Sequence, residues 1–180
     1  MPVDVRFFAP LGSLSLGELA KQTGSGLFGD EDLELTGISS AANGRRGDLG
    51  FLDGDGKSAI EINPDISALV VNDANVARIP DGIPYIISKF PRHVHGTAAV
   101  KLFRPRHLDW HGESAISPDA TVAESVKIAP GAAIAPGAVI GAGTFIGANA
   151  VIGPGVQIGR NCVIGPAATV FCALIGDHVR

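Results

Sequence analysis

The second half of the chain carries an aliphatic residue at every sixth position. These positions are Ile116, Val122, Ile128, Ile134, Ile140, Ile146, Ile152, Ile158, Ile164 and Val170. Because six is a multiple of the strand period of two and not of the helical 3.6, their side chains share one face of short strands. Pro-Gly and Ala-Gly pairs between them suit tight corners. Stacked coil on coil with the aliphatic residues inside, such units predict a parallel β-helix.

The residue before each interior position points outward from its strand. Several of these outward residues are apolar, namely Val139, Phe145, Val151 and Val163. If one coil takes eighteen residues, Phe145 and Val163 stack on the same outer face. An apolar strip on a flat face predicts burial against another subunit, and scattered apolar residues on a monomer remain the alternative.

The sixfold spacing ends after Val170. The next aliphatic-Gly pair, Ile175-Gly176, follows after five residues, and the chain then stops at Arg180. No capping helix or polar closing repeat is evident, although a solenoid that ends in mid-coil exposes interior residues. We therefore expect the β-helix to be incomplete at its C-terminus and the chain to be the front part of a longer protein.

Residues 1–105 have a different pattern, without the sixfold repeat, and predict a small α/β domain. Ser15 and Glu18 form a capping box that opens a short helix, with Gly24 near its end. A second helix is expected from Pro91 to about Phe103, with an apolar stripe at every fourth residue. Strand-like runs lie at 33–38, 49–52, 68–71 and 84–87. Residues 106–115 are the predicted linker, and 116–180 the β-helix.

Composition and charge narrow the possible partners. An apolar content of 46% with 18% charged residues excludes an intrinsically disordered chain. The net charge of -4 and the pI of about 5.7 provide no basic surface for nucleic acid or an anionic membrane. Prolines interrupt the charge-free stretch 128–159, so no membrane span is predicted. Cys162 and Cys172 form no CxxC pair, which fits a reducing cytoplasm.

The sixfold repeat resembles the hexapeptide-repeat family, whose prisms have three hexapeptides per coil and a left-handed wind. The order of a small α/β domain, a helix and such a prism is similar to the UDP-3-O-(3-hydroxyacyl)glucosamine N-acyltransferases of lipid A synthesis. The segments Thr36-Gly37-Ile38, Gly47-Asp48-Leu49-Gly50-Phe51-Leu52-Asp53 and Ser67-Ala68-Leu69-Val70-Val71 carry this resemblance. It implies a homotrimer that transfers a 3-hydroxyacyl chain from acyl carrier protein to the 2-amine of a UDP-3-O-acylglucosamine.

The resemblance also implies where the UDP-sugar would bind. In the family, the uracil lies between aromatic rings on a pattern of Phe, Asn and Tyr at three-residue spacing. Phe51 matches the first position, whereas Gly54 and Lys57 stand at the other two, so the second ring is missing. Phe51 is the candidate stacking residue, Asp53 a candidate acceptor for the uracil imide, and Lys57 a candidate phosphate ligand. The alternative is that Phe51 is a buried strand residue beside a solvated turn.

No residue of this chain matches the family's catalytic histidine, which lies on a later coil. None of the five histidines falls between Gly112 and Asp177, and His178 does not match the catalytic segment. We therefore assign no catalytic residue and expect the 180-residue chain to be inactive. Neither a cofactor nor a metal is predicted: His93 and His95 would face different directions on a helix, and His107 and His111 lack a third ligand.

Four other functions are known for such repeats or compatible with them. A sugar-nucleotide O-acyltransferase of the same fold and a non-catalytic structural β-helix remain open alternatives. A γ-type carbonic anhydrase needs three zinc-binding histidines at a subunit interface, and the repeats contain none. An ice-binding solenoid would need regular threonine ladders, whereas Thr144 and Thr169 are isolated. The reading frame beyond Arg180 would discriminate most directly among these classes.

Overall fold

The computed structural model describes residues 3–57, 60–112 and 114–180 and divides the chain into two compact units. One unit comprises Val3 and Pro10–Arg104, and the other comprises Asp4–Ala9 and Pro105–Arg180. Within the described ranges, no helix combines the length and the hydropathy that crossing a bilayer requires. The short strands β1 (Phe8–Pro10) and β9 (Phe103–Pro105) pair with each other, and η3 (Arg106–Leu108) follows β9.

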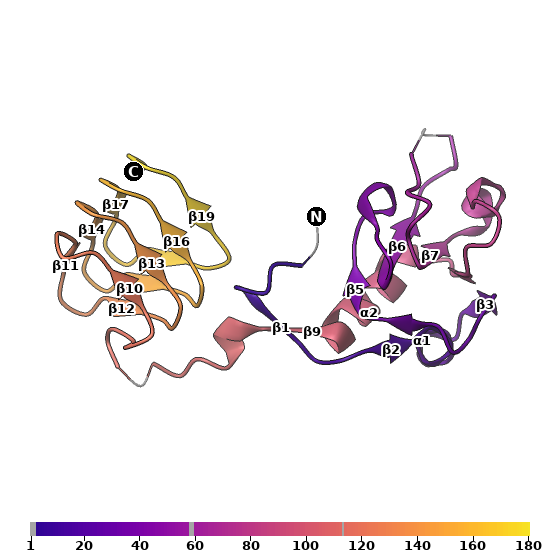
Figure 1. Ribbon diagram of the computed structural model, residues 1–180, viewed down its shortest axis with the longest axis horizontal. Coiled ribbons are helices and arrows are strands. Elements are labelled where there is room, and N and C mark those ends of the chain that lie inside the picture. The colour runs from indigo at the N-terminus through magenta and orange to yellow at the C-terminus, as the bar shows by residue number, and fades with distance from the viewer. Residues whose placement is uncertain (1–2, 58–59, 113) are drawn as a thin grey trace. The chain divides into compact units, whose positions relative to one another are not determined.

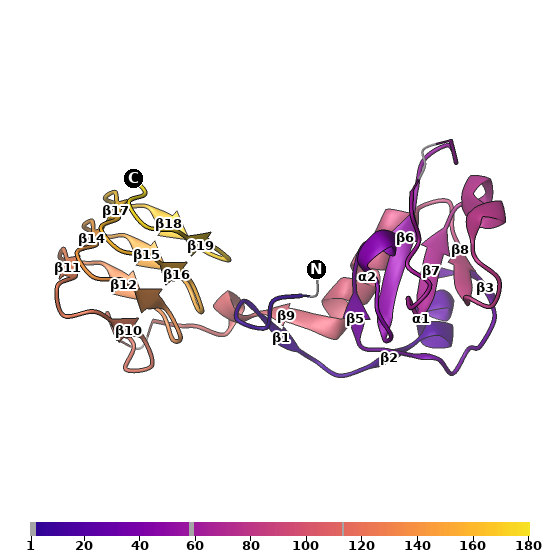
Figure 2. The ribbon, with the colours of Figure 1, turned by 45° about the horizontal axis from the view of Figure 1, so that its top comes forward.

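The first unit is built on a five-stranded sheet in the order β3-β8-β7-β6-β5 (Figure 2). All neighbours are parallel except β3 and β8. The strands are β3 (Gly26–Phe28), β5 (Gly37–Ile38), β6 (Asp48–Leu52), β7 (Ala68–Val71) and β8 (Tyr85–Ile87). All four residues of β7 are buried, because this central strand is covered on both faces. The remaining elements are β2 (Leu14–Ser15), β4 (Glu34–Leu35), η1 (Ala41–Asn43) and η2 (Asp73–Arg78).

The two helices of this unit begin and end where the sequence predicts. Helix α1 (Leu16–Thr23) starts with Ser15, whose hydroxyl accepts from the Glu18 N–H at 3.1 Å. It ends at Gly24, whose φ of 61° is the left-handed conformation that glycine adopts freely. Helix α2 (Pro91–Leu102) has proline in its first turn and buries the expected stripe of Val94, Ala98 and Leu102. It packs against β5, β6 and β7.

The second unit is a parallel β-helix that confirms the sixfold repeat. Its two-residue strands form three parallel sheets, in the orders β10-β13-β16-β19, β11-β14-β17 and β12-β15-β18 (Figure 1 and Figure 2). Val122 pairs with Ile140, and Ile140 with Ile158, so one coil takes eighteen residues. This geometry fits the left-handed β-helix expected for hexapeptide repeats. The strands are β10 (Thr121–Val122), β11 (Lys127–Ile128), β12 (Ala133–Ile134), β13 (Val139–Ile140), β14 (Phe145–Ile146), β15 (Val151–Ile152), β16 (Gln157–Ile158), β17 (Val163–Ile164), β18 (Thr169–Val170) and β19 (Leu174–Ile175).

The interior of the β-helix is the predicted aliphatic ladder. Its buried members include Ile134, Ile140, Ile146, Ile152, Ile158 and Ile164, packed with small residues of the corners such as Ala138, Ala150 and Cys162. The first position, Ile116, lies outside the strands and is held by an isolated bridge to Ile134. Burying ladder side chains of this size contributes about 1.5–3 kcal/mol each to folding. The small corner residues let successive coils approach closely enough for their backbones to pair.

From Gly131 onward, one corner residue per repeat adopts a positive φ. Glycine occupies this corner at Gly131, Gly137, Gly143 and Gly155, whereas Asn149, Asn161, Ala167, Cys172 and His178 adopt it with a side chain. Asparagine tolerates the left-handed region better than most residues with a Cβ. Alanine has no such advantage, so Ala167, with a φ of 57°, is the clearest strained corner.

The break in spacing after Val170 does not interrupt the pairing. Ile175 lies in β19 opposite Ile158, seventeen residues earlier in the chain. The missing residue is absorbed at the corner, where Cys172 adopts a φ of 49°. A shorter corner therefore preserves the β16–β19 pairing where the sequence pattern alone indicates a break.

The N-terminal segment belongs to the β-helix unit, whereas the sequence-based division places it in the 1–105 domain. Phe7 is only 7% exposed and packs in the same core cluster as the interior isoleucines. Its carbonyl accepts from the Arg106 N–H at 2.9 Å, which ties the segment to the residues just before the coils. A single aromatic residue has no periodicity, so the sequence pattern does not reveal this packing. Of the predicted linker 106–115, residue 113 lies outside the described residues.

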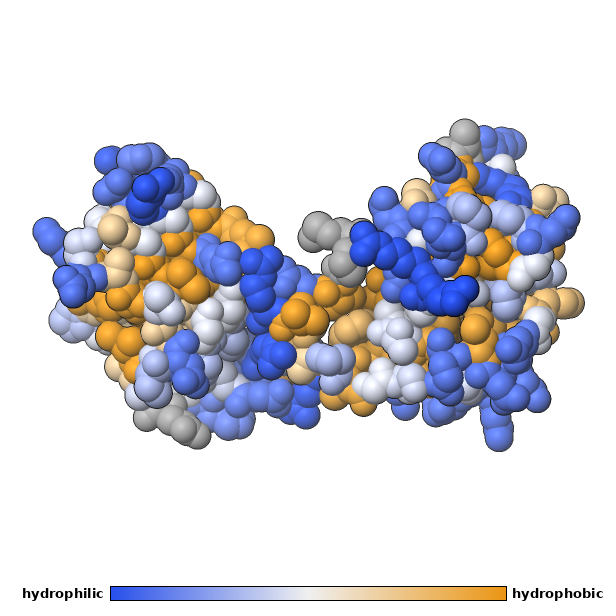
Figure 3. Space-filling model, viewed as in Figure 1, coloured by the Kyte–Doolittle hydropathy of each residue, from blue (hydrophilic) through white to orange (hydrophobic). Residues whose placement is uncertain are grey.

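Three of the four predicted outward apolar residues are exposed on the coils. Figure 3 shows apolar surface on this part of the chain. Phe145 lies opposite Val163 in adjacent parallel strands, as an eighteen-residue coil requires. They are 37% and 38% exposed, which are high values for such large apolar side chains in strands. Val139, on a neighbouring sheet, is also exposed, and Val151 is half-buried.

Candidate functional site

Phe51 lies in β6 of the α/β unit, next to the central strand, with its ring half-buried. Two side chains from α2 contact this ring. The His95 ring lies 4.9 Å away between centroids, at a tilt of 50°. The Arg92 guanidinium carbon lies over the ring, 5.7 Å from its centroid. The helix packed against β6 thus supplies both polar neighbours of the predicted stacking residue.

Asp53 joins the same cluster. One carboxylate oxygen accepts from Arg92 Nε at 3.0 Å, and the other accepts from the Gly54 N–H at 2.8 Å. The Arg92 side chain is 78% exposed and that of Asp53 35% exposed, so this ion pair lies at the surface. Lys57 is not brought into the cluster, because its ammonium faces Asp55 at 3.8 Å in a strongly exposed pair. Two of the three predicted site residues are therefore neighbours, and the third lies apart from them.

The loop after Asp53 is held by two asparagine side chains. Asn72 and Asn75 each donate from the side-chain amide to the Gly54 carbonyl, at 2.8 Å and 3.3 Å. Asn75 is fully buried, and it also donates to the Asn72 side chain at 2.6 Å. Gly54 adopts a φ of 90°, which glycine reaches without steric cost. These contacts fix the Gly54 carbonyl, next to the Asp53 carboxylate.

His95 packs against Phe51 with its ring in the neutral form. Its Nε2 lies 3.1 Å from the Leu49 carbonyl, and because a carbonyl only accepts, the neutral ring carries its proton on Nε2. Burial lowers the pKa of His95, and hydrogen bonds to the backbone at Leu49 and Ser39 offset part of this effect. His93, two residues earlier on α2, is exposed. The two histidines therefore differ in environment, as their spacing on a helix predicts.

A pocket of about 610 Å³ opens beside this cluster. It is lined by Asp53, Lys89, Phe90, Arg92 and His93. Lys89, Phe90 and His93 are exposed, so the pocket presents a solvent-accessible, partly basic rim around the Asp53 carboxylate. The sequence pattern does not single out Lys89, Phe90 or Arg92, because their position depends on α2 packing against β6. In the sequence, these residues are marked only by a run of basic and aromatic residues at the start of α2.

The β-helix unit has a second pocket of about 610 Å³. It is formed by the N-terminal segment, residues that follow β9 and successive corners of the coils, with Arg6, Trp110, His111, Asp119, Pro136 and Gly155 among its lining. His107 is not among the residues that line this pocket. Its ring packs against the Phe171 ring, with 5.1 Å between the two centroids. Across the described ranges, no three His, Cys, Asp or Glu residues are grouped so that they would hold a metal ion.

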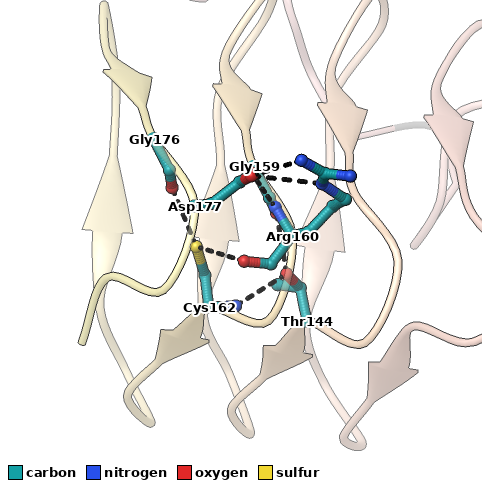
Figure 4. A network of polar contacts seen from close by, with 6 residues as sticks. All are labelled: Thr144, Gly159, Arg160, Cys162, Gly176 and Asp177. Atoms are coloured by element: carbon teal, nitrogen blue, oxygen red, sulfur yellow. Dashed lines mark hydrogen bonds and ion pairs between the residues drawn. The ribbon is translucent and has the colours of Figure 1, made fainter.

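A buried polar contact links successive coils of the β-helix (Figure 4). The Thr144 hydroxyl accepts from the Cys162 N–H at 3.0 Å and donates to the Gly159 carbonyl at 2.9 Å. Thr144 and Cys162 are both fully buried, so Cys162 is part of the core, and its thiol donates to the Gly176 carbonyl at 3.0 Å. On the outside, Arg160 pairs with Asp177 at 2.7 Å and lowers the pKa of that carboxyl. These contacts support the last coils.

One comparison with known proteins, a family match, agrees with the architecture of the second unit. Residues 137–172 match the family described as bacterial transferase hexapeptide, six repeats. Among solved structures, the chain is similar to the acetyltransferase domain of PglB from Neisseria gonorrhoeae FA1090 in complex with acetyl coenzyme A. The identity is 18%, the TM-score is 0.30, and 58% of each chain is covered. The chain thus spans less than two thirds of that domain's length. The coils from Gly137 to Cys172 are hexapeptide repeats of the type found in bacterial transferases.

Proposed function

We propose that this chain carries the nucleotide-sugar-binding domain and β-helix coils of a hexapeptide acyltransferase of lipid A synthesis. The reaction moves a 3-hydroxyacyl chain from acyl carrier protein to the 2-amine of a UDP-3-O-acylglucosamine, in the cytoplasm. The observation that carries the proposal is the cluster of Phe51, Asp53 and Arg92 in a domain that precedes hexapeptide repeats. An aromatic face, a carboxylate and a cation together match the base and the diphosphate of a nucleotide.

Each member of the cluster has a role in this proposal. The Phe51 ring would stack on the uracil, because an aromatic face buries a flat heterocycle without blocking its polar edge. Asp53 would accept a hydrogen bond from the uracil imide, since its carboxylate is held beside the ring by Gly54. His95 would keep the Phe51 ring in place from α2. Lys57, with its ammonium directed to Asp55, has no part in the cluster as it stands.

The chemistry of the proposed reaction needs a proton acceptor. The amine nitrogen attacks the thioester carbonyl, the new N–C bond forms, and the C–S bond breaks to release the carrier thiol. The amine loses a proton as it attacks, so a general base must lie within hydrogen-bond reach. The sequence places no histidine between Gly112 and Asp177, and we assign no catalytic residue in this chain.

The proposed assembly is a homotrimer that buries the outward strip of Phe145 and Val163. Introducing a charge there by Phe145→Asp should convert the trimer to a monomer, because a carboxylate cannot be buried without a partner. Thr169→Asp, an exposed position on another sheet, is the matched control and should leave the trimer intact. Light scattering after size-exclusion chromatography measures the mass directly. A monomeric native chain would contradict the proposed assembly.

Calorimetric titration with UDP-N-acetylglucosamine tests the binding proposal. Phe51→Ala should weaken binding by about 5- to 150-fold, because stacking a base on an aromatic ring contributes about 1–3 kcal/mol. Phe28→Ala is the matched control, since Phe28 is a half-exposed phenylalanine of the same unit that stacks on Tyr85. It should not change the affinity. Equal affinity of the native chain and Phe51→Ala would remove the proposed base site.

A further inference from the structure

Arg92 occupies the surface that a stacked base would need. Its guanidinium lies over the Phe51 ring, and its Nε donates to the Asp53 carboxylate. In this arrangement both the aromatic face and the hydrogen-bond acceptor of the proposed base site are already engaged. A base can reach Phe51 and Asp53 only if the Arg92 side chain moves.

The Arg92 side chain is free to make that movement. It is 78% exposed, and its ion pair with Asp53 lies at the surface, where such pairs contribute little to stability. A contact of this kind breaks readily when a better partner for the guanidinium arrives. Asp53 keeps its hydrogen bond from the Gly54 N–H, so the carboxylate stays in position after Arg92 has left.

The adjoining pocket offers such a partner a place to bind. Lys89, Arg92 and His93 line it together with Asp53 and Phe90. Two permanent cations face one carboxylate there, so the pocket favours an anion. A volume of about 610 Å³ accommodates a diphosphate. A guanidinium binds two phosphate oxygens in a bidentate geometry, which a lysine ammonium cannot reproduce.

We propose that Arg92 is a mobile clamp that exchanges Asp53 for the diphosphate of the nucleotide sugar, an inference that rests on the proposed function. In the free protein, Arg92 covers Phe51 and pairs with Asp53. When the ligand binds, the guanidinium transfers to the diphosphate beside Lys89. The same movement releases the Phe51 face for the base and the Asp53 carboxylate for its edge. The site thereby selects a nucleoside diphosphate over the nucleoside alone.

The test compares uridine, UDP and inorganic pyrophosphate by calorimetric titration of the native chain, Arg92→Ala and Arg92→Lys. With Arg92→Ala, the affinity for UDP and for pyrophosphate should fall by about 10- to 100-fold, because charge-assisted hydrogen bonds are lost. The affinity for uridine should stay the same or rise, since the ring is uncovered. Arg92→Lys should retain part of the UDP affinity. Lys101→Ala, an exposed cation at the other end of α2, is the matched control and should change none of these values.

The outcomes separate this inference from the proposed function. If Arg92→Ala weakens uridine and UDP by the same factor, or weakens neither, Arg92 is no clamp, although a Phe51-dependent uridine affinity would still support the base site. If pyrophosphate binds in an Arg92-dependent manner and uridine does not bind at all, the anion-binding pocket is confirmed and the proposed base site is refuted. If the native chain binds none of the three, both the clamp and the base site are refuted.

Discussion

The hydroxyl of Thr144 replaces a turn hydrogen bond that most other corners make directly. At the corner from Gly165 to Ala168, for example, the last N–H donates to the first carbonyl at 3.3 Å. At the corner from Gly159 to Cys162, the Thr144 hydroxyl lies between these two groups and bonds to both. Thr144→Val keeps the shape of the side chain and removes only this bridge.

The expected loss of stability follows from the two backbone groups left without a partner. Each buried, unpaired N–H or carbonyl costs about 1–3 kcal/mol. Because the corner can relax partly toward the direct bond, we expect Thr144→Val to lower the free energy of unfolding by about 2–4 kcal/mol. Thr144→Ser retains the hydroxyl and loses one methyl group, so its cost should be about 1 kcal/mol.

Urea denaturation followed by the fluorescence of Trp110 measures this effect. Trp110 is the single tryptophan of the chain and lies in the β-helix unit, so its fluorescence follows the unfolding of that unit. Thr169→Val removes a hydroxyl from an exposed strand position and is the matched control, with an expected change below about 0.5 kcal/mol. If Thr144→Val were as stable as Thr169→Val, the bridging role of the hydroxyl would be refuted.

Further predictions concern the corner strain and two titrating groups. Ala167→Gly should raise the free energy of unfolding, measured in urea, by about 1 kcal/mol, because a side chain with a Cβ is strained at the φ of 57°. The control is Ala142→Gly, at an exposed corner alanine without a positive φ, which should lower the free energy of unfolding by about 0.5–1 kcal/mol. The pKa of Asp177 is lowered, so its pair with Arg160 stabilises the last coil above pH 3.8, and this stabilisation is lost as the pH falls through the lowered pKa. In an NMR titration, the midpoint of Asp177 should lie below pH 3.8 and should return toward 3.8 in Arg160→Gln. Burial of His95 lowers its pKa, so the neutral ring stabilises the fold above pH 6.5 and this contribution is lost on acidification; an NMR midpoint at or above 6.5 would contradict that environment.

The β-helix could be predicted from the sequence because its contacts repeat. Each interior residue meets its counterpart eighteen residues away, so one rule places every strand from β10 to β18. The rule does not cover the short corner after Val170, where pairing of Ile175 with Ile158 is retained by a local change in backbone conformation. Nor does it cover Phe7, which reaches the same core from a segment without any repeat.

The candidate site could be predicted only in part, because its residues come from distant segments. Phe51 and Asp53 are two residues apart on one strand and its following turn, and the sequence pattern places them together. Arg92 and His95 lie about forty residues later, and only the packing of α2 against β6 brings them to the ring. Lys57 is close in sequence, yet the turn that begins at Gly54 directs it to Asp55. The sequence shows which residue types are present, and tertiary packing decides which of them meet.

NMR observation of the Phe51 and His95 rings during a titration with UDP tests the central claim most directly. We predict saturable shifts of both rings and of the Arg92 side-chain N–H, with Phe28 and Tyr85 unchanged, because the base would stack on Phe51 and displace Arg92. Saturable binding that leaves Phe51, His95 and Arg92 unshifted, or no binding at all, would contradict the nucleotide-sugar site.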